Sequence, residues 1–286
     1  MIQSLDLRGR TLTAADLLAL VPRSASGIGS AAATVDALIA DVRERGTAAL
    51  LDQAERFDRV RPPHLRVPLG ALREAEAALE PRVRAALVEA IDRVRRGTAA
   101  QVPPNVTTEI APGARIVQRW QPVDRVGLYV PGGKAVYPSS VVMNVVAAQV
   151  AGVPSIALAS PAQAAFGGSV HPTILGAAHL LGVDEVYAMG GAGAIGALAY
   201  GVPDLDLEPV QVITGPGNLF VATAKRAVTG VVGIDSEAGP TEILIVADAT
   251  ANADLVVADL VSQAEHDELA GAVLVTDSPA LAAAVE

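Results

Sequence analysis

Cysteine is absent from this 286-residue chain, and aromatic side chains are scarce: three Phe, four Tyr and one Trp. The lack of cysteine excludes disulfides, cysteine-ligated zinc, iron–sulfur clusters and a cysteine nucleophile. So few aromatic rings argue against a nucleic-acid site built on base stacking. The core must therefore consist mainly of Ala, Val, Leu and Ile, which agrees with a hydrophobic content of 51%.

Basic residues are also in short supply, since 21 Lys and Arg face 31 Asp and Glu, a formal net charge of −10. Only six of the basic residues lie in 101–286, so the sequence offers no basic patch for a phosphate backbone. The most apolar stretch, residues 141–166, is interrupted by Asn, Gln, Ser, Gly and Pro, whereas a membrane span needs about 20 continuous apolar residues. The charged N-terminal segment lacks the apolar core of a signal peptide. We therefore expect a cytoplasmic protein.

The apolar pattern changes character along the chain. The first hundred residues show helical spacing, with runs over 34–46, 47–57 and from Pro81 onward. After about residue 115, short apolar strands alternate with helices, which indicates crossover units and a mostly parallel sheet. The sequence therefore predicts the α/β class with a helical N-terminal part. The predicted strands are 125–130, 155–159, 185–189, 210–213, 243–247 and 272–276.

The end of the chain is abrupt. Ser278 and Pro279 start a predicted helix that has no stop signal by Glu286. A sheet strand followed by half a helix is an unusual place for a domain to finish, so we expect the C-terminal part of the fold to be missing from this chain.

Three strand-to-helix turns are rich in glycine: 131–133, 190–196 and 215–217. In open parallel sheets, ligands bind beyond the carboxyl ends of the strands, where helix N-termini present free N–H groups. Residues 191–196 match the dinucleotide pattern G-x-G-x-x-G, although the acid expected about 20 residues later is poorly placed. Tight packing of the helix against a strand is the alternative interpretation. In the third turn, Asn218 can cap a helix beside glycines that admit a ligand, or the segment is simply a capped turn.

One of the four histidines, His266, lies near the end of a predicted helix in the segment SQAEHD. Gln263 and His266 are three residues apart and so project from one helix face. An imidazole and an amide oxygen suit zinc if further ligands come from elsewhere. The commoner role for a histidine at a helix end is an interaction with the helix dipole.

Four segments of the chain, in this order, resemble the histidinol dehydrogenase family: VGLYVPGGKAVYPSSVVMNVVAAQVAGV, ITGPGNLFVATAKR, IDSEAGPTEI and ADLVSQAEHDE. The resemblance runs from about residue 5 to the end. It implies an NAD- and zinc-dependent homodimer that oxidises L-histidinol through L-histidinal to L-histidine, the last steps of histidine biosynthesis. It also implies an aldehyde-dehydrogenase-like fold with two incomplete Rossmann-like domains. The first would comprise 1–127 with 239–286, and the second, on the NAD side, would be the inserted segment 128–238.

The family's functional residues can be carried over where the motifs match. By this resemblance, Tyr129 and Asn218 contact NAD, and Thr241 contacts the substrate. Gln263 and His266 match two ligands of one zinc ion per subunit that also border the substrate. The family's acid/base pair and its other zinc ligands would lie beyond Glu286, so the resemblance implies no catalytic residue in this chain. We expect these 286 residues alone to be inactive.

One residue departs from the family pattern. The family usually has Gln, an NAD contact, where this chain has Gly193. Two alternatives therefore stay open: a family member that oxidises another small alcohol, such as a hydroxysulfonate, and a non-catalytic remnant. In either oxidising case, the absence of cysteine rules out a thioester and favours an aldehyde hydrate in the second oxidation, with a general base to deprotonate it.

Overall fold

The computed structural model describes residues 3–21, 28–132, 136–237, 241–265 and 270–286. The chain divides into two compact units. The larger unit is Ile28–Glu237, and the smaller unit combines Met1–Gly27 with Ala238–Glu286. Among the described residues, no helix has the length and apolar character that crossing a membrane requires.

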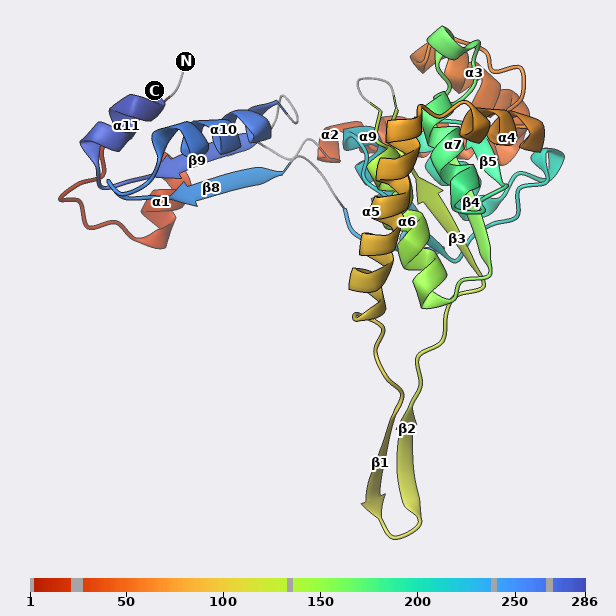
Figure 1. Ribbon diagram of the computed structural model, residues 1–286, viewed down its shortest axis with the longest axis horizontal. Helices are drawn as coiled ribbons and strands as arrows, with labels where there is room; N and C mark the ends of the chain where they lie inside the picture. The colour runs from red at the N-terminus through yellow and green to blue at the C-terminus, as the bar shows by residue number, and fades with distance from the viewer. Residues whose placement is uncertain (1–2, 22–27, 133–135, 238–240, 266–269) are drawn as a thin grey trace. The chain divides into compact units, whose positions relative to one another are not determined.

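A five-stranded sheet forms the centre of the larger unit, and all its neighbouring strands are parallel (Figure 1). The chain runs outward from β3 through β4 to β5 and then returns to the other side of β3. The order of the strands therefore reverses between β3 and β6, which is where open α/β sheets bind ligands. In spatial order the strands are β5 (Val186–Ala188), β4 (Ser155–Ser160), β3 (Arg125–Tyr129), β6 (Val212–Thr214) and β7 (Gly233–Ile234).

Helices cover both faces of this sheet. Along β4, Ala157 and Ala159 pack into one apolar cluster, whereas Leu158 points into another, as expected for a parallel sheet buried on both sides. The helices of the first cluster are α2 (Ile28–Arg45), α3 (Thr47–Phe57), α8 (Gly191–Tyr200) and α9 (Leu219–Val228). Those of the second are α4 (Leu69–Ala77), α5 (Pro81–Ala99), α6 (Pro138–Ala151) and α7 (Pro172–Leu180). Two short 3-10 turns, η1 (Ala164–Phe166) and η2 (Pro203–Leu205), connect elements. The predicted α/β class with a mostly parallel sheet is confirmed.

The helical N-terminal part belongs to this unit, which differs from the predicted grouping of 1–127 with 239–286 and of 128–238 as a separate domain. Val35 and Ile39 of α2 lie in the first cluster, and Leu72 of α4 and Leu87 of α5 lie in the second. The apolar faces of these helices must be buried, and they pack in the clusters on the two faces of the five-stranded sheet. Helix α2 also begins six residues earlier than the predicted run at Thr34.

Three strands in the larger unit have no counterpart in the sequence prediction: the two-residue β7 and the two strands of a hairpin. Strands β1 (Val106–Ala111) and β2 (Ala114–Gln118) form an antiparallel hairpin between α5 and β3 (Figure 1). Every residue of both strands is exposed, including Ile110 and Ile116. A strand without a buried face has no alternating pattern, so its sequence carries little strand signal.

The smaller unit contains one strand–helix–strand crossover. Strand β8 (Glu242–Val246) pairs in parallel with β9 (Gly271–Val275), and α10 (Ala253–Ala264) connects them. This confirms the predicted alternation at the end of the chain. The unit also contains α1 (Ala14–Leu20) and α11 (Pro279–Val285).

Candidate functional site

Tyr129 ends β3 at the carboxyl edge of the five-stranded sheet, and its side chain is buried. Its hydroxyl accepts a hydrogen bond of 3.2 Å from the backbone N–H of Gly191 at the start of α8. Burial raises the pKa of Tyr129 to about 12, the bond from Gly191 opposes this rise, and the charge of Asp58 adds to it. The tyrosine is therefore a neutral group at physiological pH.

The turn after β6 packs directly against the end of β3. Gly215 has a φ of +119°, and a Cβ there would overlap the carbonyl oxygen of Tyr129, so only glycine fits. Asn218 caps α9, because its Oδ1 accepts hydrogen bonds of 3.1 and 3.2 Å from the N–H groups of Phe220 and Val221. The structure thus brings Tyr129 and Asn218, the two residues predicted to contact NAD, to the ends of neighbouring strands, while the contact itself stays a prediction.

An ion pair with one buried partner holds this turn in place. Lys225 of α9 is 1% exposed and pairs with Asp235, which follows β7. The Lys225 ammonium also donates to the carbonyl oxygen of Gly215 at 3.0 Å, and the Asp235 carboxylate accepts from the Gly215 N–H at 2.9 Å. Sequence reasoning missed both residues. The available signal was a lysine on the apolar side of the helix segment LFVATAKRAV, next to an exposed arginine.

Two polar side-chain atoms lie buried beside the turn after β3. Ser160 ends β4 with no exposed surface, and its Oγ finds no hydrogen-bond partner in the part of the chain that the structure describes. The same holds for the buried Nε2 of Gln163. A Cβ added to Gly132 would lie 3.0 Å from Gln163 Nε2 and 3.3 Å from Ser160 Oγ. Both atoms therefore face the same bare glycine, an arrangement that the sequence did not predict.

The smaller unit brings together two of the predicted substrate residues. Gln263, in the last turn of α10, donates from Nε2 to the carbonyl oxygen and to Oγ1 of Thr241, both at 2.9 Å. These bonds use the amide nitrogen, and the amide oxygen, the atom that a zinc ion would take, is not part of them. His266 lies outside the described residues, so its predicted place beside Gln263 is untested.

The described residues do not by themselves make a zinc site. Among them, no three His, Cys, Asp or Glu side chains gather closely enough to hold a metal ion. Gln263 is the one predicted ligand within the described part of the chain, and a single amide oxygen does not hold zinc.

Comparison with known proteins identifies the family. A family model described as histidinol dehydrogenase matches residues 21–286. The histidinol dehydrogenase of Leifsonia xyli subsp. xyli is 66% identical over 279 residues, which cover 98% of this chain and 64% of the relative. The histidinol dehydrogenase of Thermobifida fusca is 58% identical over 286 residues, 100% of this chain and 64% of the relative.

This chain belongs to the histidinol dehydrogenase family. Its fold agrees with a crystal structure of histidinol dehydrogenase from Elizabethkingia anophelis, with a TM-score of 0.87 at 30% sequence identity. That match covers 96% of this chain and 63% of the other. The chain thus spans a little less than two thirds of the length of these relatives.

In this histidinol dehydrogenase family chain, two of the three glycines that match the dinucleotide pattern lie where helices pack closely. A Cβ at Gly193 would overlap Oε1 of Gln53, a buried side chain of α3 whose Nε2 donates to the carbonyl oxygen of Leu38 at 3.1 Å. A Cβ at Gly196 would lie 3.3 Å from the side chain of Ile39 in α2. These two glycines thus allow tight packing, but of helix against helix, whereas the sequence prediction was of helix against strand.

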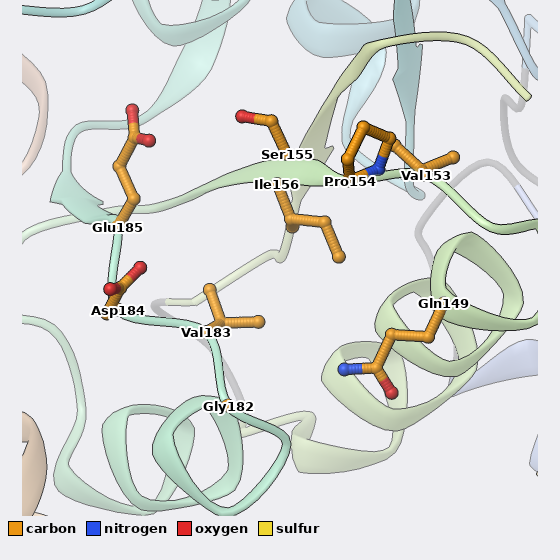
Figure 2. A pocket seen from close by; sticks show the side chains of 9 residues that line it. All are labelled: Gln149, Val153, Pro154, Ser155, Ile156, Gly182, Val183, Asp184 and Glu185. Carbon is orange, nitrogen blue, oxygen red and sulfur yellow. The ribbon is translucent and has the colours of Figure 1, made fainter.

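A cavity of about 230 Å³ lies at the opposite edge of the sheet, by the amino ends of β4 and β5 (Figure 2). Several of its polar side chains are already engaged. Glu185 forms an ion pair with Arg125, which holds the pKa of the Glu185 carboxyl below its usual range against the opposing effect of burial. Gln149 donates to the carbonyl oxygen of Leu181 at 2.6 Å. This cavity is therefore a weaker candidate than the glycine-lined carboxyl edge.

Proposed function

We propose that this chain carries the dinucleotide site of a cytoplasmic histidinol dehydrogenase, which oxidises L-histidinol through L-histidinal to L-histidine with NAD. One observation carries the proposal: the turn after β6 lies against the end of β3, at the point where the strand order reverses. The names of the relatives supply the substrate, and the glycines at this edge supply the close approach that a dinucleotide needs.

The residues at this edge fit such a ligand. Bound NAD would supply the acceptor for the hydride removed from the alcohol. Tyr129 contributes a neutral phenol ring fixed by its bond to Gly191, and Asn218 contributes an amide whose nitrogen is not used in capping α9. The unpartnered Ser160 hydroxyl offers a further hydrogen-bonding group to an oxygen-rich ligand.

We assign the substrate side to the smaller unit. In this proposal Thr241, Gln263 and His266 contact histidinol, and Gln263 and His266 contribute to a zinc site, one ion per subunit, that further residues must complete. Zinc would orient the amino alcohol. The chain's own contribution is to hold the Gln263 side chain by its two bonds to Thr241. The family's acid/base pair matches no residue of this chain, so we expect the chain alone to produce no NADH from histidinol.

We also propose a homodimer, to which the β1–β2 hairpin contributes. Ile110 is 64% exposed and Ile116 is 59% exposed on this hairpin. Apolar side chains gathered on an exposed hairpin are typical of a surface that another chain covers.

Titration of the purified chain with NADH, followed by the fluorescence of the dinucleotide, tests the cofactor proposal. We expect saturable binding that Asn218→Ala weakens about tenfold through loss of a hydrogen bond to the dinucleotide. Asn252→Ala is the matched control, because Asn252 caps α10 through the same kind of bond, to the N–H of Asp254 at 2.9 Å. Absence of saturable binding, or equal losses in both variants, would contradict the proposal.

A second candidate is oxidation of another small alcohol by the same family architecture. Gly193 favours this alternative. The family resemblance predicts a glutamine at this position, but here the side chain is missing and Gln53 fills its space. Steady-state assays of the protein at the length of its relatives, with histidinol and competing alcohols, distinguish the two. A kcat/KM for histidinol well above that for every competitor would support the first proposal.

A further inference from the structure

We propose that Ser160 and Gln163 form a subsite for the diphosphate of the dinucleotide, an inference that rests on the proposed NAD function. Ser160 Oγ and Gln163 Nε2 are buried and have no hydrogen-bond partner among the described residues. Both atoms lie against Gly132, at 3.3 and 3.0 Å from the position that a Cβ would take there.

Such atoms are rare in folded proteins. A buried hydroxyl or amide without a partner has lost its hydration and gained nothing in exchange, so it destabilises the fold. In the described part of the chain, Thr47 Oγ1 is the only other buried side-chain polar atom in this state. Two of these three unpartnered atoms therefore lie together, against Gly132. Their clustering indicates hydrogen bonds that a ligand completes.

Ser160, Gln163 and Gly132 lie at the edge of the sheet where the topology favours a ligand. Ser160 ends β4, Gly132 follows β3, and Pro161 packs against Gly190 at the start of α8, 2.9 Å from the position of a Cβ there. The N-cap residue of α8, Gly190, has no side chain to cap the helix, and the Gly191 N–H is bound by the Tyr129 hydroxyl. Two glycines, two side-chain donors and a helix N-terminus whose cap residue has no side chain therefore lie together at the carboxyl edge.

The chemistry of this set selects an anion rich in oxygen. The Gln163 amide nitrogen can only donate, and the Ser160 hydroxyl can donate as well. Phosphate oxygens accept hydrogen bonds and carry negative charge, which the N-terminal end of a helix favours. In NAD, the group with these properties is the diphosphate.

Three single variants test this assignment, with NADH binding and thermal unfolding as readouts. Ser160→Ala should raise the Kd for NADH about tenfold while leaving the Tm of the free protein unchanged or higher, because it removes an unpartnered hydroxyl. Gln163→Glu should raise the Kd further, since a carboxylate repels phosphate. Thr47→Val is the matched control, because it removes the third unpartnered hydroxyl, beside Asp204 beyond the other end of α8, and should leave the Kd unchanged.

Each contrary result has a distinct meaning. If the unmodified chain binds NADH and Ser160→Ala binds it equally well, the subsite is wrong and the proposed function stands. Unchanged or tighter binding by Gln163→Glu would also overturn the assignment, because a ribose hydroxyl, unlike phosphate, can donate to a carboxylate. A lower Tm of free Ser160→Ala would show that the hydroxyl serves the fold. If the unmodified chain shows no saturable NADH binding, the proposed function fails and this inference fails with it.

Discussion

The hydroxyl of Tyr129 and the backbone N–H of Gly191 form a 3.2 Å hydrogen bond that joins the end of β3 to the start of α8. Tyr129→Phe leaves this N–H without its partner, so we expect a loss of about 1–3 kcal/mol in the free energy of unfolding and weaker NADH binding. Because the pKa of Tyr129 is about 12, both effects should be the same from pH 6 to pH 9. Urea unfolding and NADH titration at several pH values measure them.

Tyr187→Phe provides the matched control for this substitution. Tyr187 is also fully buried, and its hydroxyl donates to Glu185 at 2.7 Å, in the network at the amino edge of the sheet. We expect this variant to lose stability and to keep its affinity for NADH. Equal losses of affinity in the two variants would show that the Tyr129 effect is only structural.

Removing either partner of the Lys225–Asp235 pair should lower the free energy of unfolding, but by different amounts. Asp235→Asn leaves a Lys225 ammonium that is 1% exposed without its counter-ion, so we expect a loss of about 3–5 kcal/mol in stability. Lys225→Met leaves a carboxylate that is 36% exposed and can be hydrated, so its cost should be smaller. Equilibrium unfolding in urea compares them directly. A larger loss in Lys225→Met would contradict this account of the turn after β6.

The parts of this fold that were predictable are local in sequence. The alternation of apolar strands with helices is visible in any short window, and so is the cap that Asn218 provides for α9. The carboxyl edge as a ligand site follows from strand direction alone, because parallel strands bring their ends to one edge. Tyr129 and Asn218 were found by family resemblance, and their adjacency follows from this topology.

The remaining features depend on contacts between distant segments. Lys225 is held by Asp235, and Ser160 meets Gly132, only because neighbouring strands place separate turns side by side. The larger unit likewise gains α2 to α5 because their apolar faces match the sheet, which helical periodicity cannot reveal. The β1–β2 hairpin was missed for a different reason: exposure on both faces removes the alternating signal.

The close approach of Gly193 and Gln53 predicts that a second substitution, at Gln53, restores stability lost by a substitution at Gly193. A Cβ at residue 193 meets Oε1 of Gln53, whose amide is held by Leu38, so Gly193→Ala must displace a buried, hydrogen-bonded side chain. We expect Gly193→Ala to cost about 1–3 kcal/mol in stability, as overpacked cores do. Adding Gln53→Ala should recover part of this loss by freeing the space. Thermal unfolding of both single variants and the double variant measures the coupling, and strict additivity would contradict the contact.

Asp58, at the end of α3, gives the fold a dependence on pH that opposes the usual behaviour of an acid. Burial raises the pKa of Asp58 from 3.8 to about 6, so the folded state binds its proton more tightly than the unfolded state does. The stabilisation is fully present below pH 3.8 and is lost as the pH rises through 6. Because the side chain is only partly buried, screening by solvent reduces the effect to about 1 kcal/mol.

Asp58→Asn isolates this contribution, because the amide has the same shape and does not titrate. Other acids change in parallel in both proteins, so the difference between their free energies of unfolding reports Asp58 alone. We expect the unmodified protein to lose about 1 kcal/mol relative to Asp58→Asn between pH 4 and pH 7, with the change centred between 4 and 6. Urea unfolding at half-unit steps of pH measures this difference. A flat difference would show that the carboxyl is hydrated in the folded protein, and a gain with rising pH would mean that a positive charge pairs with it.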